Sequence, residues 1–410
     1  MLKRVVITGI GGITALGKNW SVIRQCFERG ENAVIRMAEW DKFTELNTRL
    51  AAPILHYQPP SHWTRKQLRS LGRVSQYCVE AAEIALSDAG LLNDKTIKDG
   101  RMGVASGSST GSTKDVCDLA QLISQGDSEG FSANTYVRMM PHTTAANVAI
   151  FFNLKGRVIP TSSACTSGSQ AIGYAYEAIK FGRIHMMLAG GGEELCPSES
   201  HVFDALYATS LKNDTPKLTP IPYDSRRDGL VIGEGAGMLV LEEYEHAKAR
   251  RAKIYAEIVG FGSNCDGTHI TRPEAETMYQ AMKLALADAN LKPDAIGYVN
   301  GHGTATEQGD IAETQATSRL FGEHMPISSQ KSYLGHTLGA CGVLESWFSI
   351  MMMNEDWFAP TANLVDVDPR CGKLDYIKGQ GRHIHTDYVM NNNFAFGGIN
   401  TSLIFKRFSE

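Results

Sequence analysis

The chain has 410 residues, of which 43% are hydrophobic and 20% charged, and this is enough for two domains or one duplicated fold. A net charge of −4 argues against nucleic acid as the main partner. The eight cysteines are scattered and form no C-x-x-C pair, which favours a reducing, cytoplasmic compartment over a disulfide framework or a zinc site. We expect neither a signal peptide nor a membrane span, because no apolar run approaches the required length.

The first elements in chain order predict an α/β protein. Residues 4–8 predict a strand that ends in a turn at Gly9. The glycines that follow do not complete a G-x-G-x-x-G fingerprint, since Thr14 stands at the third glycine position, so a dinucleotide site is not expected. Helices are predicted over residues 20–29 and from 65 through 89, and a strand over 102–105. Residues 113–157 have the pattern of an insertion with helical patches.

The stretch around Cys165 predicts an extended run, a tight turn of small residues and then a buried helix that begins near the cysteine. Unpaired N–H groups and the positive end of the helix dipole favour a thiolate there. A lowered thiol pKa would make Cys165 a nucleophile near neutral pH. At this point a small buried core cysteine is an equally good interpretation.

After a predicted connector helix at residues 242–251 the sequence pattern starts again. Residues 7–11 recur as 258–262, the helix at 81–91 recurs as 281–291, and the 160–163 segment recurs as 326–329. A series of matches in the same order indicates duplication rather than chance. We therefore expect two pseudo-symmetric α/β halves, residues 1–250 and 251–410, with the chemistry where they meet.

Two histidine loops in the second half are candidates for that chemistry. His302 follows a predicted strand and lies between Gly301 and Gly303, and His336 lies in the glycine- and threonine-containing segment 331–340. The duplication places His336 in the second copy of the Cys165 turn, so the two residues are predicted to converge. A zinc site formed by Cys165, His302 and His336 lacks motif spacing and a carboxylate ligand, so we expect no metal.

Five motifs, together spanning nearly the whole chain, resemble those of the β-ketoacyl-[acyl carrier protein] synthases of the KAS I/II type, which are condensing enzymes with a thiolase-like fold. They are Ser163-Ala164-Cys165-Thr166-Ser167-Gly168, Arg227-Asp228-Gly229 through Gly237, His302-Gly303-Thr304-Ala305-Thr306 through Asp310, Lys331-Ser332 through His336, and Asn393-Phe394-Ala395-Phe396-Gly397-Gly398. The resemblance implies an αβαβα core of two duplicated halves.

The resemblance also implies a reaction. Cys165 would take an acyl group from an acyl carrier protein, and His302 and His336 would stabilise the enolate formed when malonyl-[acyl carrier protein] loses CO2. Attack on the acyl-cysteine would release a 3-oxoacyl thioester. Lys331, paired with Glu345, would support the histidines, and the N–H groups of Cys165 and Phe396 would form an oxyanion hole. No bound cofactor is expected, because phosphopantetheine on the carrier protein holds the acyl groups.

Further residues receive roles from the same resemblance. Thr304 and Thr306 would hold the pantetheine arm, with Phe394 also in the substrate site. Phe396 would gate the acyl pocket, whose floor would include Thr110. Ala395 stands where family members often have glycine, which puts the motion of the gate loop in question. Because the carrier protein is acidic, we expect a basic dock. Its candidate residues are Arg65, Lys66, Arg69 and Lys212.

The assembly and the pathway are less defined by the sequence. The resemblance implies a homodimer, or a heterodimer with a related ketosynthase-like subunit. Residues 139–144, 159–163 and 391–396 resemble ketosynthases of aryl polyene pigment clusters more than housekeeping fatty-acid enzymes. The alternatives are a chain-length-factor-like partner subunit, which usually lacks the cysteine, and a degradative thiolase, which carries a second catalytic cysteine that Cys371 does not match.

Overall fold

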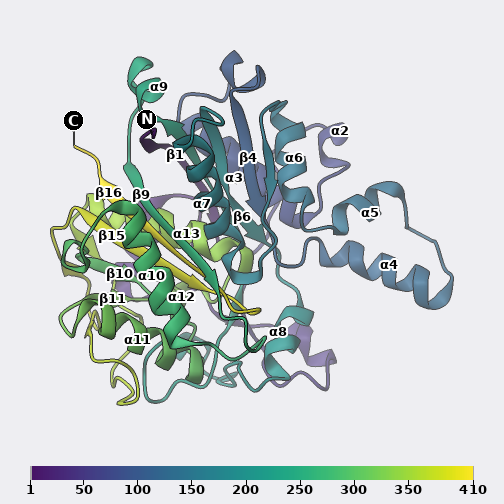
Figure 1. Cartoon of the computed structure of the whole chain (residues 1–410). Helices are drawn as coiled ribbons and strands as arrows, with labels where there is room; N and C mark the ends of the chain where they lie inside the picture. The colour runs from purple at the N-terminus through teal and green to yellow at the C-terminus, as the bar shows by residue number, and fades with distance from the viewer. Residues whose placement is uncertain (1, 410) are drawn as a thin grey trace.

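The computed structural model describes residues 2–409 and contains one sheet of eleven strands, in the order β13-β11-β10-β15-β16-β9-β1-β8-β6-β4-β5 (Figure 1). Five of these strands come from the first half: β1 (Val5–Thr14), β4 (Met102–Gly107), β5 (Val158–Pro160), β6 (Met186–Glu193) and β8 (Gly235–Glu243). The other six come from the second half: β9 (Ala256–Cys265), β10 (Tyr298–Asn300), β11 (Pro326–Ser328), β13 (Asp375–Tyr376), β15 (Tyr388–Phe394) and β16 (Ile399–Arg407).

Helices connect these strands in both halves. The first half has α1 (Trp20–Arg29), α2 (Arg65–Leu68), α3 (Arg73–Asp88), α4 (Thr113–Gln125), α5 (Ala133–Met139), α6 (Thr143–Phe152), α7 (Ser167–Lys180), α8 (Pro197–Asp204) and α9 (Tyr244–Ala249). The second half has α10 (Ala275–Ala289), α11 (Glu307–Phe321), α12 (Lys331–Leu334) and α13 (Cys341–Asn354). Two small sheets add β2 (Ile35–Arg36), β3 (Leu50–Ala52) and β7 (Ile232–Gly233), and β12 (Trp357–Phe358) with β14 (Arg382–His383).

The strand order shows the duplication directly. The series β5-β4-β6-β8-β1 is repeated in reverse as β9-β16-β15-β10-β11, and corresponding neighbours pair in the same sense: β4 with β5 and β10 with β11 are parallel, whereas β8 with β1 and β16 with β9 are antiparallel. The two series join where Val5, Val6 and Ile7 of β1 pair with β9. The predicted pseudo-symmetric α/β fold is therefore confirmed.

Glycines in the two central strands explain why the strands and their helices lie so close. A Cβ atom at Gly11 would come within 2.1 Å of the Ala81 carbonyl oxygen in α3, and a Cβ at Gly262 would come equally near the Ala281 oxygen in α10. The prediction of a turn at Gly9 is wrong for this reason. The glycines continue β1 through to Thr14 and form a surface against which α3 packs.

The elements stack in five layers. Helix α3 packs on β1 and β8, α10 packs on β9 and β16, and α7 and α13 pack against each other between the two parts of the sheet. The largest apolar cluster joins this central helix pair to both halves and includes Ile172 of α7 and Phe348 of α13. The N-termini of α7 and α13 consequently meet in the interior.

The structure also departs from the helix predicted over residues 65–89, whereas the helical patches predicted over residues 113–157 are confirmed. The helix predicted over residues 65–89 is two helices, because Thr64 caps α2 in a capping box and Gly72 provides a new N-cap for α3. Residues 113–157 contain three helices, of which α4 and α5 project from the body as an arm (Figure 1).

Within residues 2–409, no helix is both long and apolar enough to cross a bilayer.

Candidate active site

Cys165, His302 and His336 line one cavity of about 400 Å³. They come from different halves of the chain, and their exposed fractions are 4%, 6% and 2%. Cys165 Sγ lies 3.0 Å from His336 Nε2, and the two imidazole ring centres are 5.1 Å apart. The structure therefore brings together Cys165 and His336, which the duplication predicted to converge, and places His302 in the same cavity.

Cys165 sits in a short 3₁₀ turn, Ala164–Thr166, that leads into α7. Burial raises the pKa of the Cys165 thiol to about 11, although the N–H groups of Phe396 and of Cys165 itself and the charge of Lys331 act in the opposite direction. The predicted thiolate is therefore wrong for the resting protein, because lost hydration outweighs the helix terminus. Cys165 rests as a thiol, with His336 Nε2 positioned to accept its proton.

The backbone shows which residue of the second half corresponds to Cys165. Ala164 has a φ of 50° just before α7, and Leu338 has a φ of 44° just before α13, so the two 3₁₀ turns have the same backbone form. Gly339 therefore stands at the position equivalent to Cys165. His336 lies three residues earlier in the same loop and reaches the cysteine from the opposite helix terminus.

The backbone of His302 is fixed by a buried carboxyl group. Glu313 on α11 accepts hydrogen bonds from the N–H groups of His302 at 2.5 Å and Gly303 at 2.7 Å. Burial raises the pKa of Glu313 to about 8, although these two N–H groups oppose the shift. A Cβ atom at Gly303 would lie 2.4 Å from the Tyr223 hydroxyl, which explains a glycine there. Glu313 thus holds the loop that carries His302.

The other side of the His302 ring faces Lys331. Lys331 Nζ lies 3.1 Å from His302 Nδ1 and also pairs with Glu345, as predicted, and Glu345 accepts a further hydrogen bond from Asn393 at 2.7 Å. Burial works against the ammonium, but its neighbours, the paired Glu345 among them, outweigh burial and raise the pKa of Lys331. Because an ammonium has only donors, Nδ1 accepts and the imidazole proton resides on Nε2.

Both histidines are neutral. Burial, followed by the nearby charge of Lys331, lowers the pKa of His302 and of His336 well below 6.5. The backbone of His336 is hydrogen bonded to β7 through Val231 O at 2.7 Å and Gly233 N at 2.9 Å. A neutral imidazole that carries its proton on the nitrogen facing the substrate can donate to a developing oxyanion without first being protonated.

The loop after β15 brings a second group of donors to the sulfur. The Phe396 N–H points at the Cys165 sulfur closely enough to stabilise a negative charge on it. The loop turns at Gly397 and Gly398, with φ values of 85° and 73°, and the Phe396 ring lies 4.8 Å from that of Phe203. The N–H groups of Cys165 and Phe396 therefore both face the sulfur, and their role as an oxyanion hole stays a prediction.

Thr304 and Thr306 line the same cavity, and their hydroxyl oxygens are 2.8 Å apart. Phe394 and Phe396 line it too, and the Phe394 ring centre lies 6.1 Å from that of His302. Thr110 does not contribute to the cavity lining. Its hydroxyl oxygen lies 2.9 Å from a Glu193 oxygen and 2.8 Å from a Glu199 oxygen, and its one proton is donated to one of these two buried groups.

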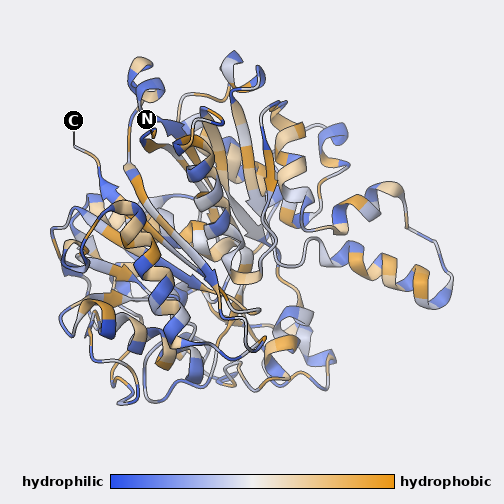
Figure 2. Cartoon of the chain, viewed as in Figure 1, coloured by the Kyte–Doolittle hydropathy of each residue, from blue (hydrophilic) through white to orange (hydrophobic). Residues whose placement is uncertain are grey.

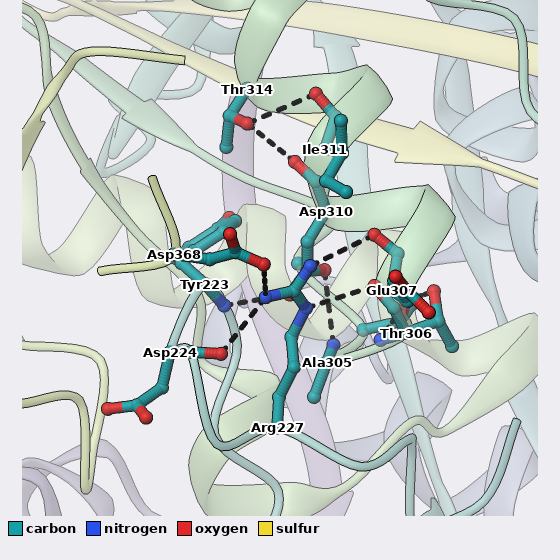
Figure 3. Close-up of polar contacts among 12 residues, drawn as sticks. Tyr223, Asp224, Arg227, Ala305, Thr306, Glu307, Asp310, Ile311, Thr314 and Asp368 are labelled. Atoms are coloured by element: carbon teal, nitrogen blue, oxygen red, sulfur yellow. Dashed lines mark hydrogen bonds and ion pairs between the residues drawn. The ribbon is translucent and has the colours of Figure 1, made fainter. Parts of the chain in front are cut away.

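A buried arginine organises the threonine loop (Figure 3). The Arg227 side chain is 2% exposed and forms ion pairs with Asp368 at 2.7 Å and Asp310 at 3.4 Å. It also donates to the carbonyl oxygens of Thr306 at 3.4 Å and Glu307 at 3.0 Å. Arg227 thereby ties the loop that carries both threonines to the start of α11.

The candidate dock residues fall in two places. Arg65, Lys66 and Arg69 are exposed at α2, whereas Lys212 is half-buried, pairs with Asp228 at 2.9 Å, and so lies beside the cavity lining. In Figure 1, α2 and α8, the helix before the Lys212 loop, lie at different ends of the molecule. One chain therefore does not bring the four residues into one patch.

Sequence reasoning missed several residues of this site. Glu193, Glu313 and Cys341 are buried beside it, and Asn393 was quoted only as part of a motif. Their signal was weak because each is a common residue inside a helix or at a strand end. A buried Glu and a surface Glu look the same in a single sequence, because only their surroundings in the folded protein distinguish them.

The comparisons with known proteins agree with this geometry. The family model described as "Beta-ketoacyl synthase, N-terminal domain" matches residues 2–247, and "Beta-ketoacyl synthase, C-terminal domain" matches residues 255–365. A fold and a cysteine-histidine-histidine site of this kind define a condensing enzyme. The chain belongs to the beta-ketoacyl synthase family, which confirms the family and the fold class predicted from its motifs.

Three similar proteins place the chain within the family. A crystal structure of a beta-ketoacyl synthase from Burkholderia phymatum STM815 is 61% identical, with a TM-score of 0.98 over 99% of this chain and 100% of that one. The 3-oxoacyl-[acyl-carrier-protein] synthase 2 of Vibrio cholerae serotype O1 is 38% identical over 99% of both chains. The structure titled "The ishigamide ketosynthase/chain length factor" is 28% identical, with a TM-score of 0.91 over all of both chains.

Proposed function

We propose that the chain is a 3-oxoacyl-[acyl-carrier-protein] synthase that condenses a cysteine-bound acyl group with malonyl-[acyl carrier protein]. The observation that carries the proposal is the contact of 3.0 Å between Cys165 Sγ and His336 Nε2, beside a neutral His302, in one cavity. Full-length relatives with this activity in their names support it. A chain-length-factor-like subunit is disfavoured because Cys165 and both histidines are present.

The first step transfers the acyl group to the protein. Cys165 Sγ attacks the carbonyl carbon of the acyl thioester, and the thiol proton passes through His336 to the departing pantetheine sulfur. The tetrahedral oxyanion accepts hydrogen bonds from the N–H groups of Cys165 and Phe396. Donors fixed in this way are worth about 3 kcal/mol each in the transition state.

The second step breaks a carbon–carbon bond and forms another. Once the sulfur is acylated it no longer donates to His336, whose imidazole proton can then lie on Nε2. The malonyl thioester oxygen accepts hydrogen bonds from His302 Nε2 and from His336 Nε2, CO2 leaves, and its bonding electrons form an enolate. The enolate carbon attacks the acyl-cysteine carbonyl, and the collapse of this second tetrahedral intermediate expels the Cys165 sulfur as a thiolate. The thiolate then takes a proton from solvent, and the 3-oxoacyl thioester departs on its carrier.

The remaining residues would bring the substrate to this centre. Thr304 and Thr306 would hold the pantetheine arm, Phe394 would contact the substrate, and Phe396 would gate the acyl pocket. Thr110, which lies outside the cavity of one chain, would reach an acyl chain only if the pocket extended past Glu193. The basic residues at α2 and Lys212 would meet the acidic carrier. Neither a bound cofactor nor a metal is part of the proposal.

Mass spectrometry of the protein after incubation with acylated carrier proteins tests the first step. The proposal expects an acyl mass on the Cys165 peptide, and the acyl group that transfers best reveals the preference of the pocket. An unmodified Cys165 peptide with every acyl group offered would contradict the proposal.

Decarboxylation of malonyl-[acyl carrier protein] tests the second step separately. Cys165→Ala should still release CO2 without forming a condensation product, whereas His302→Ala and His336→Ala should lose CO2 release as well. The opposite pattern would overturn the assigned roles.

We further propose that the protein works in an aryl polyene pathway, with fatty-acid elongation as the alternative. Three motif stretches in the chain support it, at residues 139–144, 159–163 and 391–396. The test compares polyunsaturated and saturated acyl groups on the carrier protein. Faster transfer of the polyunsaturated group to Cys165 supports the aryl polyene assignment, and a clear preference for saturated chains excludes it.

We also propose that the protein works as a homodimer. Strand β5 is an open edge of the sheet, with Val158 46% exposed, and the nearby arm exposes Ile123 at 75% and Tyr136 at 47%. Figure 2 shows hydrophobic residues along this arm. An unpaired strand edge and exposed apolar side chains favour burial against another chain. A related ketosynthase-like subunit is the alternative partner.

A further inference from the structure

Two groups of metal-binding side chains share His302. Cys165, His302 and His336 each offer one ligand atom within 4.8 Å of the others, and so do His302, Cys341 and Glu345. All five residues are buried. Thiolate sulfur and imidazole nitrogen are the atoms that Zn²⁺ prefers, at 2.0–2.3 Å. A cation bound by the first group would occupy the nucleophile and both proton donors together.

Lys331 lies where the second group would hold a cation. Its Nζ is 3.1 Å from His302 Nδ1 and is paired with the Glu345 carboxylate. The side chain is 2% exposed, so little water screens its charge. The ammonium therefore takes the place of a metal ion among His302, Cys341 and Glu345.

The Lys331 ammonium also affects metal binding by the first group, Cys165, His302 and His336. Lys331 donates to Nδ1 and thereby keeps the imidazole proton on the other nitrogen, Nε2. A protonated Nε2 has no lone pair for a metal, so binding there requires His302 to move its proton to Nδ1 against the ammonium. A divalent cation would in addition lie next to a fixed positive charge.

We propose that Cys165, His302 and His336 form a latent site for soft divalent cations, and that the Lys331 ammonium keeps zinc out of it. This role is separate from support of the enolate and does not depend on the proposed reaction. Occupation of the site would replace the Cys165 thiol proton by the metal, release that proton to solvent and block acyl transfer. Lys331 thus protects a site whose ligand set is otherwise suited to zinc.

The test is a titration with Cd²⁺, which absorbs in the ultraviolet when it binds thiolate. Cys117 and Cys265 are exposed and will also bind, so each protein is measured beside the same protein carrying Cys165→Ser, and the difference is the signal. We expect the Cys165-dependent affinity to be at least about 100-fold higher in Lys331→Met than in the unmodified protein. Zn²⁺ should displace Cd²⁺, and Lys331→Arg, which keeps the cation, should bind as weakly as the unmodified protein.

A second variant covers the case in which Lys331→Met does not fold. Lys331→Met with Glu345→Gln removes both charges of the buried pair, leaves no unpaired carboxylate and removes the only carboxylate ligand. Equal Cys165-dependent affinity in the unmodified protein and in this double variant would overturn the proposal. So would binding in Lys331→Met that survives Cys165→Ser and disappears with Cys341→Ser, because the metal would then occupy the second group.

Discussion

At the scale of single residues, burial rather than the helix terminus sets the protonation state of the site. The same loss of hydration raises the pKa of Cys165 and lowers the pKa of His302 and His336. All three therefore rest uncharged, and Lys331 with Glu345 carries the charge behind them. Charge appears at the reacting atoms only during the reaction, where fixed donors stabilise it.

The pH dependence of Cys165 alkylation follows from its raised pKa. With a thiol pKa of about 11, the rate of iodoacetamide labelling at the Cys165 peptide should rise about tenfold per pH unit from pH 7 to pH 10. Mass spectrometry of timed samples measures the rate at each pH. A rate that levels off below pH 8 would show that the helix terminus does hold a thiolate.

The histidines give a stability prediction with a definite sign. Their folded-state pKa values lie well below the unfolded value near 6.5, so the unfolded chain takes up protons first as the pH falls. Above pH 6.5 the histidines are neutral in both the folded and the unfolded chain, so they do not make the stability depend on pH. Below pH 6.5 only the unfolded chain gains their protons, so the free energy of unfolding decreases toward pH 5. The melting temperature of His302→Gln with His336→Asn should fall less over this range than that of the unmodified protein. Parallel melting curves for the two proteins would exclude this explanation.

A substitution at Arg227 tests whether this residue positions the loop that carries Thr304 and Thr306. In Arg227→Met the buried Asp310 and Asp368 lose their partner, so we expect a lower melting temperature and a loss of about 3 kcal/mol. The KM for acyl carrier substrates should rise more than kcat falls, because the loop holds the arm and not the reacting carbonyl. Arg183→Met is the control. Its side chain is exposed and far along the chain from the threonine loop, and its loss should change neither quantity. Equal effects of the two variants would refute the role of Arg227.

At the scale of elements, the two halves are built on the same contact between a glycine strand and an alanine helix. Gly9 and Gly11 approach Ala85 and Ala81 in α3, just as Gly260 and Gly262 approach Ala285 and Ala281 in α10. Neither strand tolerates a side chain at these positions without moving its helix. The same contact therefore fixes the distance between the sheet and the outer helix in each half.

A single methyl group tests that contact. Gly262→Ala places a Cβ atom 2.1 Å from a backbone oxygen, so we expect a loss of about 3 kcal/mol in urea unfolding. The control is Gly182→Ala, where φ is 68° but the Cβ meets nothing within 4 Å, and the cost should be about 1 kcal/mol. Equal losses would mean that packing in β9 is looser than the structure indicates.

Much of the fold was predictable because hydrophobic periodicity and repeated motifs can be recognised in the sequence. The helix over 20–29 and the convergence of the Cys165 and His336 loops needed only pattern and duplication. The break between α2 and α3, the extension of β1 through its glycines and the raised pKa of Cys165 were missed. The break depends on the local caps at Thr64 and Gly72. The other two depend on what a distant segment places nearby, such as Ala81 against Gly11 or the closed cavity around the sulfur.

At the scale of the whole molecule, the sheet is open at β5, and the arm of α4 and α5 stands away from the body beyond the core (Figure 1). The arm exposes Val116 at 41% and Val137 at 42%, in addition to Ile123 and Tyr136. Side chains of this kind are costly in water and are typical of surfaces that another chain covers.

Substitutions at this surface test the dimer. Ile123→Asp with Val158→Lys should shift the sedimentation profile from dimer toward monomer, because both residues would bring charge into the interface. Leu284→Asp is the control, since Leu284 is 46% exposed on α10, away from β5 and the arm, and should leave the profile unchanged. Dimers that persist in the double variant would place the interface elsewhere.

Duplication creates two equivalent reaction centres, and this protein has closed one of them. Gly339 occupies the place of the nucleophile in that second centre. Ala105 pairs with Ile159 as Val299 pairs with Ile327, so three residues further along Ser108 stands where His302 stands in the first. There the Glu193 carboxylate accepts from Gly339 N–H at 2.9 Å and from the Ser108 hydroxyl at 2.6 Å. The Glu193 side chain thus bridges Gly339 and Ser108, the counterparts of Cys165 and His302, and fills the second centre where the first has its cavity.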